Sequence, residues 1–139
     1  MTGVLLGRVA LQKMIVGDTQ LQAWQATREP TELLYTTFVN VAELLAMAEA
    51  NPKVEQRRRW VERLTQDVPA QFGPRLLPFE LKAAKSWSAM RVQLDTAKGW
   101  SDPELQTAAI AAAEQLTYVA PGAPWLDQLS ELDHADPWA

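Results

Sequence analysis

Short apolar segments with strand character alternate with helical segments along the chain, and no two successive strand segments are joined by a hairpin turn. The expected strands cover residues 3–6, 33–36, 75–79 and 117–119. Apolar residues at helical spacing predict helices over residues 9–16, 20–27, 38–50, 54–67, 80–97 and 105–115. Strands separated by helices require crossover connections and therefore favour a parallel sheet. We expect an α/β fold of three layers, α/β/α, around a central, mainly parallel sheet of four or five strands.

Size and composition predict one domain spanning residues 1–139, in which residues 126–139 form an acidic C-terminal tail able to add an edge strand. An apolar fraction of 47% and a charged fraction of 22% are ordinary for a globular protein. The absence of cysteine excludes disulfides, thiolate metal sites and a cysteine nucleophile. A net charge of −4 argues against a protein whose main partner is nucleic acid, although it does not exclude a local basic patch.

The apolar start of the chain is interrupted by Arg8 and Lys13. This interruption prevents a secretory hydrophobic region, and no segment approaches the length of a membrane span. We therefore expect a cytoplasmic protein without a membrane partner.

Glu43 is the one carboxylate in the middle of an apolar helix, which Thr37 is expected to cap. Its neighbours three and four positions away are Val39, Asn40, Ala46 and Met47, so no cation on this helix can pair with it. A buried unpaired carboxylate is costly. Glu43 therefore lies at an edge that reaches water, or it meets a metal or a cationic partner from another element.

A basic cluster follows in the next helix, where Arg57, Arg58 and Arg59 are consecutive. Glu55 and Glu62 fall at helical salt-bridging distance from several of these arginines. The cluster is interpreted first as a solvated helix face and, alternatively, as a patch that contacts RNA phosphates.

Several short stretches, in this order and spacing, resemble the PIN-domain family, and within it the VapC and FitB type of bacterial toxin ribonuclease. The resemblance covers nearly the whole chain. It implies a PIN-like fold, a homodimer, and a small antitoxin protein bound along a groove. The stretches that carry it are Val4-Leu5-Leu6, Leu21-Gln22-Ala23-Trp24, Val41-Ala42-Glu43-Leu44, Arg75-Leu76-Leu77-Pro78-Phe79, Ala108-Ala109-Ile110-Ala111, Thr117-Tyr118-Val119 and the closing Asp136-Pro137-Trp138.

The resemblance also implies an acidic site that holds Mg²⁺ or Mn²⁺ for RNA cleavage. Glu43 matches the family's helix glutamate, and Glu104, with Asp102 nearby, replaces an aspartate. The family's first aspartate is replaced in the segment that contains Gly7 and Arg8, and its last acidic segment by one containing Gly122 and Trp125. The degenerate positions are accordingly Gly7, Gly122 and Trp125.

Arg8, beside the first degenerate position, is placed to neutralise Glu43 or Glu104 and so to turn a metal site into a salt bridge. An alternative register aligns the family's first strand with residues 14–17 and restores a first acid at Asp18. Against it, the interval from Asp18 to Glu43 is shorter than the family usually shows.

Three functions follow from these patterns. The first is a degenerate PIN-like domain of toxin–antitoxin type, with weak or lost metal-dependent ribonuclease activity, that acts through protein or RNA binding. The second is an active endoribonuclease using Mg²⁺ or Mn²⁺ on Glu43, Glu104 and Asp102. The third is an RNA or ligand binder that never used the acids and needs no cofactor. His134, alone in the tail, is interpreted as a surface histidine.

Overall fold

The computed structural model describes residues 3–139, and in this part of the chain five strands form one parallel sheet in the order β3-β2-β1-β4-β5. The strands are β1 (Gly3–Leu6), β2 (Leu33–Thr37), β3 (Leu76–Leu77), β4 (Thr117–Val119) and β5 (His134–Ala135). In the centre of the sheet, Leu5 pairs with Tyr35 on one side and with Tyr118 on the other. The predicted parallel α/β fold is confirmed.

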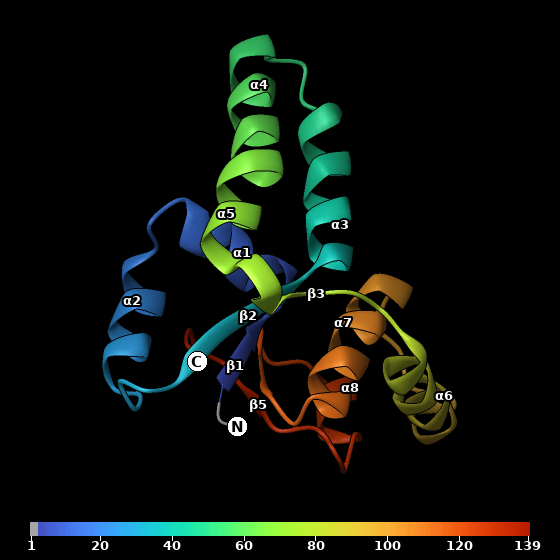
Figure 1. Cartoon of the computed structure of the whole chain (residues 1–139). Coiled ribbons are helices and arrows are strands. Elements are labelled where there is room, and N and C mark those ends of the chain that lie inside the picture. Colours follow the sequence, from blue (N-terminus) through green and yellow to red (C-terminus); the bar gives the residue numbers. More distant parts are fainter. Residues whose placement is uncertain (1–2) are drawn as a thin grey trace.

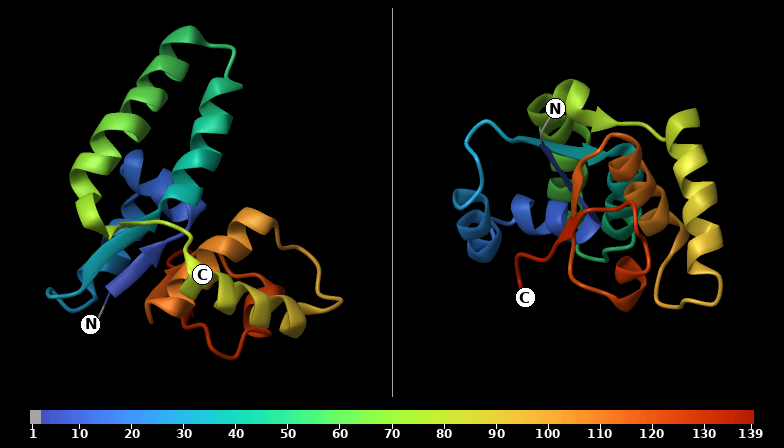
Figure 2. Two further views of the ribbon diagram at one scale, coloured as in Figure 1. Left: turned by 45° about the vertical axis from the view of Figure 1, so that its right-hand side comes forward. Right: turned by 90° about the horizontal axis from the view of Figure 1, so that it is seen from below.

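Helices connect the strands and cover both faces of the sheet (Figure 1 and Figure 2). The α-helices are α1 (Arg8–Ile15), α2 (Thr19–Ala26), α3 (Phe38–Glu49), α4 (Val54–Glu62), α5 (Val68–Phe72), α6 (Leu81–Leu94), α7 (Asp102–Ala113) and α8 (Pro124–Asp127). Within residues 3–139, no helix combines the length and the apolar character needed to cross a membrane.

Two hydrophobic clusters sandwich the sheet, and β1 contributes to both. Leu5 packs with residues of α6, α7 and α8, whereas Val4 and Leu6 pack with residues of α1, α3 and α5. This division follows the alternation of side chains along a strand. The alanine-rich helix α7 belongs to the first cluster, where Ala108 and Ala109 are fully buried.

The helix predicted over residues 54–67 is longer than expected. In Figure 1, α3 and α4 stand side by side above the sheet, and α4 continues through a π-helical turn, η1 (Arg63–Asp67), into α5. Pro69 in the first turn of α5 signals an end to a regular helix, because proline cannot donate its backbone bond. The wide turn that precedes Pro69 lets the chain stay helical to Phe72.

The predicted cap at Thr37 is confirmed, and a second side-chain cap is found at Asp18. Thr37 accepts a hydrogen bond from the backbone N–H of Asn40 at 3.1 Å, and Asp18 accepts one from Leu21 at 2.9 Å. Gly7, and not Asp18, follows the first strand, because residues 14–15 belong to α1. The alternative register at Asp18 is therefore wrong.

The C-terminal segment adds a strand to the sheet and contacts the N-terminal part of the chain. A short helix, α8, begins at Pro124, within the segment predicted as a loop, and β5 then pairs with β4. The Asp136 carboxylate accepts from the Gly122 backbone N–H at 2.8 Å. The Trp138 indole donates to the Asp18 carboxylate at 2.9 Å, which ties the last residues to the start of α2.

Candidate functional site at the carboxyl edge of the sheet

The carboxyl ends of the parallel strands bring the expected site residues to one edge. Arg8 follows β1, Glu43 lies in the helix after β2, and Glu104 lies in the first turn of α7. A pocket of about 210 Å³ opens there, and Arg8, Glu104, Tyr118, Gly122 and Trp125 line it. In parallel α/β sheets this edge is where ligands bind.

Glu43 meets a cation from another element. The Arg8 Nε lies 3.7 Å from the Glu43 Oε1, and the two side chains are 29% and 30% exposed. This separation is an ion pair but is longer than the hydrogen bond that a tight salt bridge makes. Arg8 also points its Nη1 at the Met47 sulfur, at 3.3 Å. Glu43 is thus both partly exposed and paired.

Glu104 is engaged with its own helix cap. The Glu104 backbone N–H donates to the Ser101 hydroxyl at 3.3 Å. In turn, the Ser101 hydroxyl donates to the Glu104 Oε1 at 3.0 Å. The helix therefore begins before the predicted residue 105, with a Ser101 cap and with acids at the positive end of the helix dipole. Asp102, in the same turn, is exposed and does not line the pocket.

Tyr118 is the site residue that sequence reasoning missed. It lies in the middle of β4, where an aromatic residue is typical of a core strand, and only 2% of its surface is exposed. Burial raises the pKa of its phenol well above the ordinary range; the negative charges of Glu104 and Glu43 also raise it, and Arg8 lowers it. Its phenol therefore stays neutral beside these charged groups.

A buried polar network lies at the same edge of the sheet, among residues that do not line the pocket, and was not predicted either. The Asn40 amide donates to the backbone carbonyl of Leu6 at 2.8 Å, and the Thr107 hydroxyl donates to the Asn40 Oδ1 at 3.1 Å. Thr37 meets Thr107 at 3.2 Å, and Thr36 donates to the same Leu6 carbonyl at 3.1 Å. All four side chains are at most 1% exposed. The network joins the ends of β1 and β2 to α3 and α7.

The residues at this edge do not fit a resident divalent metal. Mg²⁺ and Mn²⁺ require several oxygen ligands around one point. Across residues 3–139, no three carboxylate or imidazole side chains are close enough together to hold a metal ion. Trp125, at one degenerate position, is buried in the hydrophobic core. The positive charge of Arg8 beside Glu43 further disfavours a cation there.

The basic cluster lies away from this pocket, on α4. Arg58 pairs with Glu55 at 2.9 Å and with Glu62 at 3.9 Å, as the helical spacing predicts. Arg57 donates instead to the backbone carbonyl of Asn51, and Arg59 to that of Glu55. These contacts describe a largely solvated helix face.

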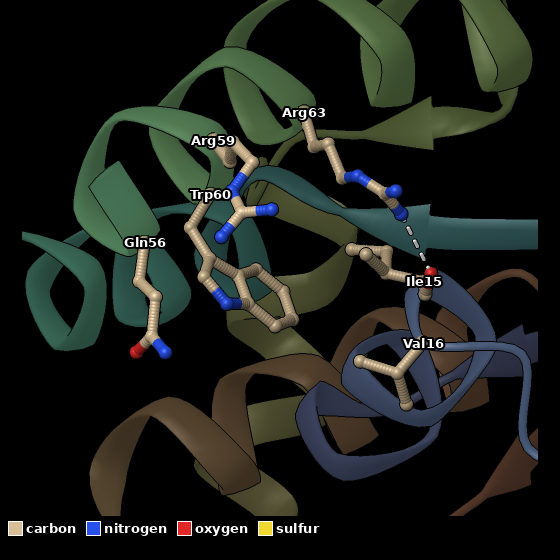
Figure 3. Close-up of a pocket in the computed structure, with 6 residues that line it drawn as sticks. All are labelled: Ile15, Val16, Gln56, Arg59, Trp60 and Arg63. Atoms are coloured by element: carbon tan, nitrogen blue, oxygen red, sulfur yellow. Dashed lines mark hydrogen bonds between the residues drawn. The ribbon is translucent and has the colours of Figure 1, made fainter.

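A second pocket, of about 420 Å³, lies between the end of α1 and α4 (Figure 3). The residues that line it are Ile15, Val16, Gln56, Arg59, Trp60 and Arg63. Arg63 donates to the Ile15 carbonyl at 2.8 Å. Within the described residues 3–139, no carboxylate lies within salt-bridge distance of Arg59 or Arg63. This pocket therefore combines two cations without acidic partners with an indole and two aliphatic side chains.

His134 is an exposed residue of β5, and its Nε2 lies 3.4 Å from the Asp127 carboxylate. The interaction connects the tail to α8, and neither His134 nor Asp127 lines the edge pocket.

No family model matches the sequence, and no curated protein matches it significantly. Solved structures do match over nearly the full length. FitAcB from Neisseria gonorrhoeae aligns with a TM-score of 0.81 and 21% identity, covering 99% of each chain. VapBC2 from Rickettsia felis, bound to a DNA fragment from its promoter, aligns with a TM-score of 0.75 and 18% identity over 100% of each chain.

VapBC-5 from Mycobacterium tuberculosis, described as a member of the VapBC family of toxin–antitoxin systems, aligns with a TM-score of 0.70 and 20% identity. The alignment covers 97% of this chain and 96% of that one. Together with the parallel five-stranded sheet and the helices on its two faces, these likenesses establish that the chain has a PIN-domain fold of the VapC/FitB type.

Proposed function

We propose that this chain is a PIN-like domain of toxin–antitoxin type that acts by binding a small partner protein, with weak or lost metal-dependent ribonuclease activity. The observation that carries the proposal is the Arg8–Glu43 ion pair of 3.7 Å at the carboxyl edge. A guanidinium beside the retained glutamate supplies the positive charge that a divalent cation would otherwise bring. The fold neighbours are toxin–antitoxin complexes, which supports a partner of the antitoxin kind.

The pocket between α1 and α4 is the surface that we assign to such a partner. Arg59 and Arg63 would take acidic side chains, and Trp60 and Val16 would take the apolar side chains beside them. Charge complementarity of this kind steers association and sets partner choice. We also propose a homodimer, for which two aliphatic side chains of α6 offer contacts, because Leu81 and Val92 are 72% and 79% exposed.

The first experiment is a calorimetric titration of Mn²⁺ into the wild-type chain and the Glu43→Gln variant at neutral pH. We expect no heat of binding in either protein and no cleavage of single-stranded RNA in Mg²⁺ or Mn²⁺. Micromolar binding that disappears in Glu43→Gln would contradict the proposal. It would favour the active endoribonuclease, with Glu43 and Glu104 as metal ligands and Asp102 as a further acid.

The partner surface is tested by fluorescence anisotropy with a labelled peptide that alternates Asp and Leu. We expect it to bind the wild type and to lose at least about tenfold in affinity in Arg59→Glu/Arg63→Glu, a loss of about 1.4 kcal/mol. The matched control is Arg58→Glu, whose arginine is held by Glu55 outside the pocket. Single-stranded RNA in EDTA is the competing probe. RNA binding that survives EDTA and Glu43→Gln, and that fails in Arg57→Glu or Arg59→Glu, would instead favour an RNA binder.

A further inference from the structure

The backbone does not demand glycine at position 7. Gly7 follows β1 and caps α1 with a φ of −70° and a ψ of 178°, an extended conformation that any residue adopts. It makes no side-chain cap, and aspartate is a better N-cap residue than glycine. Neither conformational freedom nor helix capping therefore explains why this position lacks a side chain.

The space beside Gly7 is occupied by Tyr118. A Cβ atom on Gly7 would lie 2.9 Å from Tyr118 Cε1, 3.0 Å from the phenol oxygen and 3.1 Å from the Val119 carbonyl oxygen. Contacts this short force the neighbouring atoms to move. The ring cannot move easily, because it is buried and its strand is hydrogen-bonded to the same residue: the Gly7 N–H donates to the Val119 carbonyl at 2.9 Å.

We propose that Tyr118 fills the space of the missing first acidic side chain, so that a buried phenol ring, and not only the loss of a carboxylate, closes this edge to a divalent cation. The inference rests on the function proposed above, because it explains why the pocket no longer takes metal. It assigns to Tyr118 a role that the spacing of the acids does not reveal.

The surroundings of the ring are consistent with this role. Tyr118 lines the edge pocket together with Arg8 and Glu104, so its ring borders the space that a side chain on Gly7 would share. A neutral phenol is a weak ligand for the hard cations that carboxylates hold. Arg8 adds a positive charge on the same side of the pocket. The ring and the guanidinium thus disfavour a cation by two separable effects, steric and electrostatic.

The steric effect is tested by a double-mutant cycle of Gly7→Ala and Tyr118→Val in buffer with EDTA, read as thermal unfolding midpoints. Gly7→Ala alone should lower the midpoint by about 5 °C or more, and in the Tyr118→Val background it should lower it by less than about 2 °C. Tyr118→Phe is the control, because it keeps the Cε1 atom and should leave Gly7→Ala as costly as in the wild type. Equal shifts in all three backgrounds would overturn the proposal.

The consequence for metal is tested in a gain-of-binding series that carries Gly7→Asp and Arg8→Gln, with and without Tyr118→Val. With Tyr118→Val, Mn²⁺ should give a calorimetric signal and raise the unfolding midpoint; with Tyr118 retained, it should do neither. Equal Mn²⁺ binding in both variants, or no binding by a folded triple variant, would overturn the role of the ring. Mn²⁺ binding by the wild type would contradict both the proposed function and the closure of this edge to metal. The cycle in EDTA decides separately whether the ring fills the space beside Gly7, because it measures the steric effect without metal.

Discussion

The carboxyl edge of the sheet has two sets of polar residues, a lower layer and an upper layer, which differ in burial and in how completely their polar atoms are hydrogen-bonded. In the lower layer, the Asn40 amide and the hydroxyls of Thr37 and Thr107 are buried and hydrogen-bonded to one another. In the upper layer, Arg8 and Glu43 are about one-third exposed and meet at 3.7 Å. We therefore expect the lower layer to contribute more to the stability of the fold than the upper layer does.

Hydrogen-bond direction makes the lower layer specific. Thr107 gives its one hydroxyl hydrogen to the Asn40 Oδ1, so Thr37 must donate to Thr107 while it accepts from the Asn40 backbone N–H. The Asn40 amide nitrogen holds the Leu6 carbonyl, one residue before Gly7. The carboxyl edge therefore contains a hydrogen-bonded network that holds the end of β1 next to Gly7.

The largest expected effect comes from Asn40→Asp, which breaks the lower layer. A carboxylate would face the Leu6 carbonyl without a hydrogen to donate, and we expect a loss of about 3 kcal/mol in the free energy of unfolding at pH 7. Burial raises the pKa of such a carboxyl, so the folded state binds its proton more tightly and the deficit should widen as the pH rises. Urea unfolding between pH 4 and 8 measures both effects.

Asn51→Asp is the matched control, because Asn51 accepts from the Lys53 backbone N–H through its Oδ1, a bond that aspartate keeps. A deficit for Asn40→Asp within about 1 kcal/mol of this control would contradict the two-layer description.

Local signals in the sequence predicted the fold better than they predicted the site. The alternation of strands and helices and the cap at Thr37 depend on neighbours within a few positions, and the structure confirms them. The contact between Gly7 and Tyr118 joins residues far apart in the chain and depends on the register of β1 against β4. No spacing rule gives that register, so Tyr118 was interpreted only as part of a core strand.

Asn40 shows the same limit within a helix. An asparagine in an otherwise apolar helix is noticeable, but its partners Leu6 and Thr107 come from β1 and α7. Glu43 was singled out because its own helix offers no cation, and the structure shows it partly exposed and paired with a residue of another element. Arg8 was proposed, from the departure beside Gly7, to reach Glu43 or Glu104 at hydrogen-bond distance. The structure places it 3.7 Å from Glu43, which is longer than a hydrogen bond, and among the described residues it forms no salt bridge with Glu104.

A smaller effect on the free energy of unfolding is expected at high pH from Tyr118. This residue is buried and lines the edge pocket beside the charged Arg8 and Glu104. Burial is the main cause that raises the pKa of its phenol, and the negative charge of Glu104 raises it further. The folded state therefore holds the phenol proton more tightly than the unfolded state does. The resulting stability is complete below about pH 10, the ordinary value for tyrosine, and is lost as the pH rises above it.

The measurement compares the wild type with Tyr118→Phe in urea unfolding at pH 9, 10 and 11. The wild type should lose about 1.4 kcal/mol per pH unit relative to the variant once the unfolded phenol is ionised. Tyr35→Phe, which keeps Tyr118, should retain the loss. Parallel curves for the wild type and Tyr118→Phe would show that the phenol is not held in its neutral form.

The smallest effect is expected from the Arg8–Glu43 pair, and its size tests whether the upper layer has any structural role. A cycle of Arg8→Gln and Glu43→Gln should give a coupling free energy below about 1 kcal/mol, because both groups are partly exposed and separated by more than a hydrogen bond. The coupling should shrink further in 1 M salt, where the screening length falls to about 3 Å. A coupling above about 2 kcal/mol that resists salt would place the pair with the buried network below it. In that case the guanidinium would be a structural replacement for the metal, and removing it would unfold the edge instead of leaving an intact pocket with one charge fewer.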